Sequence, residues 1–282
     1  MTLPPLPELL IEPLVRAALV EDLGPSGDVT TQAVIAPHLR YHARLNARES
    51  GIVSGVQLAE LAFRLVDPGL SVSILRGDGA EVGAGETVMV IDGAAGAILS
   101  AERVALNFMG RLSGIATLTA DFVGQTAGSR ARITCTRKTT PGLRLVEKQA
   151  VLHGGGTAHR FALSDAILIK DNHIAAAGGI AEVLTLARRA ASHMRRIEIE
   201  VDTLAQLDEV LATGGADVVL LDNMATDDLR AAVDRVAGRL VTEASGNMRL
   251  ERIADVAATG VDFISVGALT HSAQVLDLGL DF

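Results

Sequence analysis

The sequence contains few aromatic residues, few cysteines and few lysines. Among its 282 residues there is no tryptophan, one tyrosine and one cysteine, Cys135. A single cysteine excludes an intrachain disulfide and any zinc site that is built from several cysteines. The only lysines are Lys138, Lys148 and Lys170, so arginine carries most of the positive charge. Lysine is therefore informative wherever this chain uses it.

The sequence also lacks an uninterrupted apolar run of the length that crosses a membrane. Its most apolar long segment, residues 101–124, contains Arg103, Asn107 and Arg111, which a membrane helix would have to bury. The N-terminus has neither the basic start nor the small-residue cleavage pattern of an export signal. We therefore expect a cytoplasmic protein without a membrane partner.

Positive charge is scarce overall but concentrated in one region. The formal net charge is -9, which argues against a nucleic-acid-binding protein that relies on overall basicity. Between residues 137 and 173, however, six Lys or Arg and three His accompany only three acidic residues. This local excess predicts a pocket for a small polyanion. For Arg144, Glu147 and Lys148, whose spacing suits one helix face, we favour a solvated helix surface instead.

The chain after residue 130 repeats one structural unit. Short β-branched, apolar runs that end in polar residues alternate with stretches of helical spacing. The expected strands are residues 131–138, 165–172, 196–202, 216–223, 239–246 and 261–268. Successive β/α units predict a parallel sheet, and these are too few to close a complete barrel. We expect an α/β protein with an incomplete six-stranded α/β barrel.

The first 110 residues have a different pattern. Short strands with glycine turns within residues 44–55 and 77–93 follow a helix near residues 7–22. This pattern predicts a smaller N-terminal α+β sandwich domain over residues 1–110. A long helix near 100–127 is expected to join it to the catalytic barrel domain, residues 111–282. The C-terminal residues 270–282 could pack on the smaller domain.

Charged residues collect at the ends of the predicted strands. Ligands of α/β barrels bind at the carboxyl ends of the strands, where loops converge and helix N-termini offer free N–H groups. In chain order these ends carry Arg137 and Lys138, Lys170, Glu200 and Asp202, Asp222, Glu243 and Ser245, and Gly267. The loop GGGTAHR (154–160) adds His159 and Arg160 to the cations. Arginine binds a carboxylate at two points, whereas lysine is a compact charge.

The remaining strand ends suit a phosphorylated sugar. Glu200 and Asp222 could hold Mg²⁺ through water or accept hydrogen bonds from ribose hydroxyls. The turns EASGN (243–247) and VGALTH (266–271) precede expected helices, so their N–H groups could bind a phosphate. The pocket therefore predicts two anionic substrates, of which one is a phosphorylated sugar.

These motifs resemble one known family along nearly the whole chain. The matching segments are EDLGPSGDVTT, SAERVALNFMGRLSGIAT, TRKTTPGLR, GGGTAHR, LSDAILIKDNH, EIEVD, LLDN, EASGN and VGALTHS. In this order and spacing they resemble the quinolinate phosphoribosyltransferases (nicotinate-nucleotide pyrophosphorylases, carboxylating). The resemblance implies an N-terminal α/β sandwich, a six-stranded barrel and a homodimer, with a higher oligomer possible.

The resemblance also implies an activity. It is a pentosyltransferase reaction of de novo NAD biosynthesis, in which quinolinate and phosphoribosyl pyrophosphate give nicotinate mononucleotide, pyrophosphate and CO2. Mg²⁺ is expected with phosphoribosyl pyrophosphate, and no organic cofactor.

By the same resemblance, each site residue has an implied role. The residues implied for quinolinate are Thr136, Arg137, Lys138, His159, Arg160 and Lys170, with Arg103 contributed across subunits. Glu200 and Asp222 would serve the ribose and the metal, and would share catalysis with Lys138. The residues implied for the 5′-phosphate are Ser245, Gly246, Asn247, Gly267, Ala268 and His271.

Four positions depart from the commonest family pattern. Cys135 replaces an aspartate, Ala158 an asparagine, Gln149 a tyrosine and Asn247 a glycine. Asparagine tolerates left-handed backbone, so the phosphate turn can persist. Cys135 and Ala158 cannot supply the hydrogen bonds of the residues they replace, which bears on the pose of quinolinate.

Two other interpretations of the sequence are open. In an aldolase-type barrel, Lys170 at its strand end would form a Schiff base with a carbonyl substrate. In a non-catalytic paralogue, the same barrel would serve as a binding protein, because a fold alone does not determine function.

Overall fold

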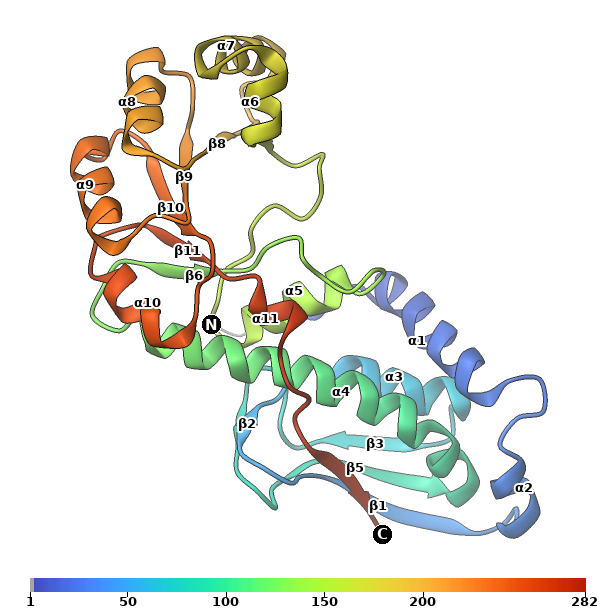
Figure 1. Ribbon diagram of the computed structural model, residues 1–282. Helices are drawn as coiled ribbons and strands as arrows, with labels where there is room; N and C mark the ends of the chain where they lie inside the picture. Colours follow the sequence, from blue (N-terminus) through green and yellow to red (C-terminus); the bar gives the residue numbers. More distant parts are fainter. Residues whose placement is uncertain (1–2) are drawn as a thin grey trace. The chain divides into compact units, whose positions relative to one another are not determined.

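The chain folds into two compact units, each with its own sheet (Figure 1). The computed structural model describes residues 3–282. The first unit takes in the chain up to Ala120, together with Thr139–Gly155 and Ser272–Phe282. The second unit comprises Asp121–Lys138 and Gly156–His271.

The sheet of the first unit is antiparallel and runs in the order β12-β1-β5-β3. Its strands are β1 (Arg40–Ala47), β3 (Ser71–Ile74), β5 (Thr87–Ala94) and β12 (Leu278–Asp281). Two short strands, β2 (Gly51–Ile52) and β4 (Glu81–Val82), pair separately. In β1 the alternate residues Ala43, Leu45 and Ala47 are buried, as expected for a strand with one face on the core.

The C-terminal segment completes this sheet. β12, at the C-terminal end of the chain, pairs with β1 (Figure 1). In this pairing Leu280 lies opposite Leu45. The segment before β12 runs close along the helix α4 (Ala95–Gly124), because glycine at position 114 leaves room for it. A Cβ at Gly114 would lie 1.8 Å from the backbone oxygen of Gln274. A side chain at that position would displace the segment.

The other helices of the first unit are α1 (Glu8–Leu23), α2 (Val29–Val34), α3 (Val56–Val66) and α5 (Arg144–His153). Helix α3 has a strongly apolar face, on which Leu58, Leu61 and Phe63 are buried. Among the described residues, no helix combines the length and the apolar character needed to cross a membrane.

The expectation of a solvated helix surface at Glu147 and Lys148 is wrong. Both lie on α5 and are buried, with Glu147 fully so. The Glu147 carboxylate accepts hydrogen bonds from Nε and Nη2 of Arg111, at 2.9 and 2.6 Å, and from the backbone N–H of Thr140 at 3.0 Å. Burial of this carboxylate is stabilised because a cation and a backbone donor pair with it.

Replacement of Glu147 by glutamine is expected to lower the free energy of unfolding by about 2 to 3 kcal/mol, because Arg111 loses its buried partner. We place the effect at the low end for such pairs since the Arg111 side chain is 29% exposed. Denaturant titration checks the value. The matched control is Glu12→Gln, which breaks the exposed pair with Arg16 and should change stability by less than about 0.5 kcal/mol. Equal midpoints for the two variants would contradict the prediction.

The second unit is a six-stranded parallel sheet in the order β6-β11-β10-β9-β8-β7. Its strands are β6 (Arg132–Thr134), β7 (Ile167–Ile169), β8 (Ile197–Val201), β9 (Val218–Asp222), β10 (Val241–Ser245) and β11 (Phe263–Ser265). Each lies within a predicted strand range. β6 and β7 are the two edges of the sheet, as in an open barrel. The prediction of an α/β fold with an incomplete six-stranded barrel and a smaller α+β unit is confirmed.

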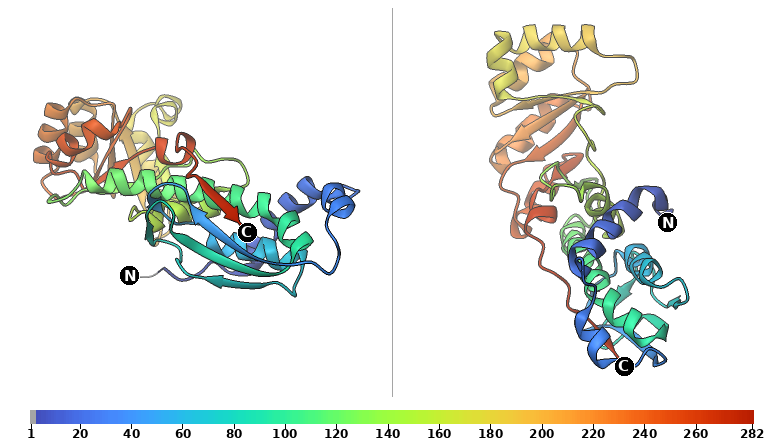
Figure 2. Two further views of the ribbon diagram at one scale, coloured as in Figure 1. Left: turned by 90° about the horizontal axis from the view of Figure 1, so that it is seen from below. Right: turned by 90° about the vertical axis from the view of Figure 1, so that its right-hand side faces the viewer.

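Helices follow the strands and cover the outer side of the sheet (Figures 1 and 2). They are α6 (Asp171–Ala177), α7 (Ile180–Ala190), α8 (Leu204–Thr213), α9 (Thr226–Val236) and α10 (Leu250–Ala257). The single turn α11 (Ala268–His271) follows β11 and is not part of this outer layer. Alternation within β8 explains the two faces of the sheet. Ile197, Ile199 and Val201 are buried, and the two glutamates between them point to the opposite side. The inner face of this sheet is therefore where charged side chains gather.

Candidate active site

A cavity of about 710 Å³ lies at the carboxyl ends of the six parallel strands. Of the residues predicted for the site, those that line it are Thr136, Arg137, Lys138, His159, Arg160, Lys170, Glu200, Asp222, Ser245, Gly246, Asn247, Gly267, Ala268 and His271. Arg103 lies on α4 in the first unit, is exposed, and is not among the lining residues. Its role across subunits stays a prediction.

Backbone hydrogen bonds beside β6 bring the segment with Arg137 and Lys138 close to the loop with His159 and Arg160. The glycine loop before His159 runs parallel to the end of β6, where Thr157 N–H donates to Ile133 O at 2.8 Å. In return, Cys135 N–H donates to Thr157 O at 3.2 Å. This pairing places Arg160 near Arg137, and burial together with the Arg137 charge lowers the pKa of Arg160. Because arginine keeps its proton in proteins, the guanidinium groups of Arg137 and Arg160 form a strongly positive side of the cavity. We call this side the cationic wall.

Lys138 is held in place through its backbone. Its N–H donates to Thr136 Oγ1 at 3.0 Å, and its carbonyl accepts from Thr270 Oγ1 at 2.7 Å. Its side chain passes over Gly267, where an added Cβ would lie 3.1 Å from Lys138 Cδ. Lys138 therefore lines the cavity beside Arg137 and close to the turn at Gly267.

Lys170, which follows β7, and Glu200 on β8 form an ion pair in the cavity. Lys170 Nζ lies 3.0 Å from Glu200 Oε2, and the backbone N–H of Lys170 donates to His173 Nδ1 at 2.9 Å. Burial raises the pKa of Glu200, while the hydrogen bond from Lys170 opposes this shift. A Schiff-base lysine needs a free nitrogen to attack a carbonyl, and the Lys170 nitrogen is hydrogen-bonded to the Glu200 carboxylate. The geometry therefore argues against the aldolase-type interpretation.

Asn223 is a lining residue that the sequence analysis missed. It follows Asp222 in left-handed conformation with φ 54°, and its side-chain amide donates to Asp222 Oδ2 at 2.5 Å. Its Oδ1 accepts from the amide of Asn247 at 3.1 Å. An asparagine directly after a strand-end acid, in LLDN, was the available signal, because asparagine is one of the few residues that adopt this conformation readily.

The turn after β10 is shaped by two consecutive left-handed residues, Gly246 with φ 89° and Asn247 with φ 46°. α10 begins only at Leu250, so the N–H groups of this turn are not those of a helix start. Consecutive turn N–H groups form an anion-binding concavity by themselves. Arg249, also missed from the sequence, lines the cavity next to this turn and adds a positive charge.

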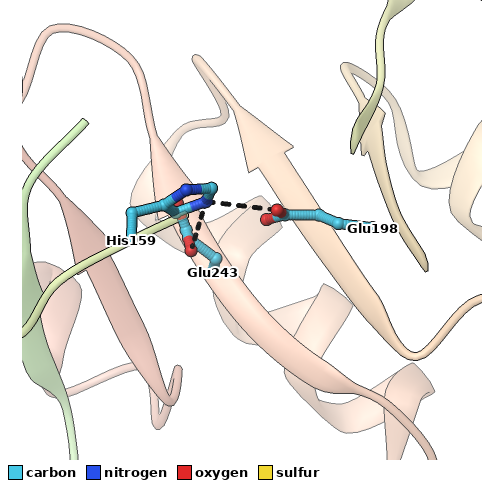
Figure 3. A group of neighbouring side chains, drawn as sticks. All are labelled: His159, Glu198 and Glu243. Carbon is cyan, nitrogen blue, oxygen red and sulfur yellow. Dashed lines mark hydrogen bonds and ion pairs between the residues drawn. The ribbon is translucent and has the colours of Figure 1, made fainter. Parts of the chain in front are cut away.

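His159 makes contacts with two buried acids, Glu198, which the sequence analysis missed, and Glu243, which it noted only at a strand end. Its Nε2 lies 3.1 Å from Glu198 Oε2 and 3.6 Å from Glu243 Oε2 (Figure 3). Its Nδ1 accepts the backbone N–H of Arg160 at 2.8 Å. Both ring nitrogens therefore have partners within the protein, and direct binding of a substrate carboxylate by His159 stays a prediction.

Glu198 could have been found from its spacing. It precedes Glu200 by two residues in RIEIEVD, and residues at this spacing share one face of a strand. Glu243 was noted at its strand end but was given no role.

Two of the positions that depart from the family pattern lie beside the cationic wall. Cys135 is fully buried and follows β6 directly, two residues before Arg137. Ala158 is exposed in the loop before His159.

Family relationships agree with this geometry. Residues 28–113 match the family domain described as Quinolinate phosphoribosyl transferase, N-terminal domain. Residues 115–281 match Quinolinate phosphoribosyl transferase, C-terminal domain. The chain belongs to the quinolinate phosphoribosyl transferase family. The membership predicted from the motifs is confirmed.

Individual members of the quinolinate phosphoribosyl transferase family are similar over nearly the full chain. A Bacillus subtilis protein named probable nicotinate-nucleotide pyrophosphorylase (carboxylating) is 42% identical over 273 residues, covering 97% of this chain and 93% of that protein. The Arabidopsis thaliana chloroplastic nicotinate-nucleotide pyrophosphorylase (carboxylating) is 44% identical, covering 96% and 82%. The solved structure of the Francisella tularensis nicotinate-nucleotide pyrophosphorylase superposes with a TM-score of 0.94 at 39% identity, covering 98% and 97%.

Proposed function

We propose that this protein is a pentosyltransferase that transfers phosphoribose from phosphoribosyl pyrophosphate to quinolinate with decarboxylation. The products are nicotinate mononucleotide, pyrophosphate and CO2, which makes this a step of NAD biosynthesis. The observation that carries the proposal is one cavity in which a cationic wall, two strand-end carboxylates and a left-handed turn adjoin one another. These three surfaces complement a dicarboxylate, a ribose and a phosphate.

The cationic wall is the proposed binding site of quinolinate. Arg137 and Arg160 would each pair with a carboxylate at two points, and Lys138 and Lys170 would add compact charges. Thr136 would add a hydroxyl group that can hydrogen-bond to quinolinate. His159, whose two ring nitrogens have partners within the protein, would act on quinolinate through those partners. Lys170 would exchange its pairing with Glu200 for a substrate carboxylate, which frees Glu200 for the ribose.

Glu200 and Asp222 are the proposed residues for the ribose and for Mg²⁺. Their carboxylate oxygens are the hard donors that Mg²⁺ prefers, and Mg²⁺ usually keeps several waters, so the residues present suit water-mediated binding. When bound with phosphoribosyl pyrophosphate, Mg²⁺ would neutralise the negative charge of the departing pyrophosphate. The 5′-phosphate would lie against Ser245, Gly246 and Asn247, with Gly267, Ala268 and His271 from the second turn.

The chemistry follows from these positions. The ring nitrogen of quinolinate attacks the anomeric carbon as pyrophosphate leaves, so positive charge develops on the sugar. Glu200 and Asp222 would stabilise that charge, because fixed opposite charges act strongly in a site shielded from water. Once the nitrogen is quaternary, the ring accepts the electron pair that decarboxylation leaves behind. No organic cofactor is needed for this step.

We also propose a homodimer in which Arg103 reaches the site of the other subunit. The resemblance to the family and the exposure of Arg103 support this arrangement. Sedimentation equilibrium measures the assembly and detects any higher oligomer. The proposed partners include no nucleic acid and no membrane, and the cytoplasmic location stays a prediction.

A direct assay tests the proposed function. Purified protein is incubated with Mg²⁺, phosphoribosyl pyrophosphate and quinolinate labelled in its 2-carboxylate. We expect nicotinate mononucleotide, pyrophosphate and labelled CO2 in equal amounts. Nicotinate, which lacks the 2-carboxylate, is the comparison substrate. Saturable binding of quinolinate without any product would instead support the non-catalytic interpretation.

Replacement of Gly246 by alanine should abolish tight binding of phosphoribosyl pyrophosphate. A Cβ there would lie 2.2 Å from Asn223 Oδ1, and alanine at φ 89° is strained as well. The matched control is Gly238→Ala, which has φ 74° but nothing within 4 Å of the new Cβ. Strain alone costs about 1 to 2 kcal/mol, so both variants should lose stability while only Gly246→Ala loses ligand binding. Thermal unfolding and calorimetric titration measure the two effects, and equal ligand affinity in the two variants would refute the prediction.

A further inference from the structure

One acid of the cavity has no role in the reaction described above. Glu243 lines the cavity although only 5% of the residue is exposed. Its Oε1 has no hydrogen-bond partner among the described residues. A buried carboxylate oxygen without a donor is costly when it is charged, which favours a protonated Glu243.

The neighbours of Glu243 strengthen this conclusion. Because His159 Nδ1 accepts the Arg160 N–H, the neutral ring carries its proton on Nε2. That proton is shared with Glu198, which lies nearer at 3.1 Å than Glu243 at 3.6 Å (Figure 3). The His159 ring is thereby hydrogen-bonded to Glu198, and Glu243 lies beside this pair at the longer distance. Two adjacent buried carboxyl groups cannot easily both be charged.

The electrostatics agree with the geometry. Burial and the Glu198 charge raise the pKa of Glu243 to about 7, while His159 and the Ser265 hydroxyl oppose the shift. The groups that face it are therefore Glu198 on β8, His159 on the glycine loop and Ser265 on β11. Leu220 of the neighbouring β9, which pairs in register with Glu243, carries no charge. An acid with such a pKa can both give and regain a proton near neutral pH.

The proposed reaction requires a proton donor, and Glu243 can serve as one. Decarboxylation exchanges a carboxylate for a hydrogen on the ring carbon next to the nitrogen, so a proton must be delivered there. We propose that Glu243 is the acid that delivers this proton, and that Glu198 and His159 position it; this rests on the proposed function. The carbon–carboxylate bond breaks, CO2 leaves, and the electron pair stays on the ring carbon. That pair takes the proton of the Glu243 O–H, and the carboxylate left behind regains a proton from water.

A metal site is the competing interpretation of the same three residues. Their ligand atoms lie within 4.8 Å of one another. A metal would need the lone pair of His159 Nε2, but the Arg160 N–H occupies Nδ1 and leaves the proton of the neutral ring on Nε2. The geometry therefore favours proton transfer over metal binding.

The test compares Glu243→Gln with the wild-type enzyme. Glutamine keeps the shape but has no acidic proton, so kcat should fall by about 100- to 10,000-fold while KM for both substrates stays within about threefold. The wild-type kcat should decline as pH rises through about 7, because Glu243 is then ionised. This alkaline decline should be absent from the residual activity of Glu243→Gln.

Two further variants make the test independent of folding defects. Glu243→Asp keeps an acid and should recover part of kcat together with the alkaline decline. Glu251→Gln, on the exposed surface of α10, should match the wild type in rate and pH profile. Wild-type kcat and an unchanged pH profile in Glu243→Gln would overturn this inference alone. A wild-type protein that forms no product would overturn the proposed function first. A stoichiometric metal that is lost in Glu243→Gln would support the competing interpretation and overturn ours.

Discussion

Replacement of Lys138 by alanine is expected to lower kcat/KM for quinolinate by about 100- to 1000-fold. The change removes one preorganised electrostatic donor, worth about 2.7 to 4 kcal/mol in a shielded site. Lys138 lines the cavity at a position that its backbone contacts fix. Its backbone is bonded on both sides, by Thr136 Oγ1 and by Thr270 Oγ1, and its side chain lies over Gly267. Steady-state kinetics with quinolinate and phosphoribosyl pyrophosphate measure the loss.

Two companion variants separate charge from shape in this experiment. Lys138→Arg keeps the charge but replaces the compact ammonium by a planar group, so it should recover only part of the activity. Arg132→Ala removes a cation from the amino end of β6, the strand that precedes Lys138, where Arg132 contacts the Phe263 ring. Its kcat/KM should stay within about threefold of the wild type. A correctly folded Lys138→Ala enzyme with nearly normal kcat/KM would remove Lys138 from the mechanism.

The sequence could place the site because local pattern and topology agree in the second unit. Each strand was recognisable from β-branched residues, and parallel strands present all of their carboxyl ends at one edge. Lys138, Lys170 and Asp222 follow three such ends, and all three line one cavity. No knowledge of side-chain conformation was needed for this step.

The burial of Glu147 could not be predicted in the same way. Charges at the spacing of Arg144, Glu147 and Lys148 have the same pattern on an exposed and on a buried helix face. What decides the burial of Glu147 is Arg111, which lies 36 residues earlier on another helix. Only the packing of α4 against α5 brings the two side chains together.

The pairing of Glu198 with Glu243 was hidden for a related reason. Their strands β8 and β10 are not neighbours, since β9 lies between them. The two carboxyl groups meet at His159, which comes from a loop rather than from a strand. A contact that depends on sheet curvature and on a loop conformation leaves no periodic signal in the sequence.

Replacement of Asp222 by asparagine is expected to weaken Mg²⁺-dependent catalysis more than substrate recognition by the cationic wall. Asparagine keeps the shape and can still accept the Asn223 amide, which lies 2.5 Å from Asp222 Oδ2. It removes the negative charge that would stabilise both the metal hydration shell and the positive sugar. The Mg²⁺ concentration for half-maximal activity should rise about tenfold or more, and kcat should fall by about 100-fold.

The separation of these effects makes the Asp222→Asn result decisive. Quinolinate affinity, measured by calorimetric titration, should change little, because Arg137 and Arg160 are untouched. Asp227→Asn is the matched control, since its side chain is 96% exposed on α9 and pairs only with Arg230 at 2.8 Å among the hydrogen bonds of the described chain. It should leave both kcat and the Mg²⁺ requirement unchanged. An Asp222→Asn enzyme with a wild-type Mg²⁺ titration would show that the metal is held elsewhere, and would leave Asp222 a role toward the ribose alone.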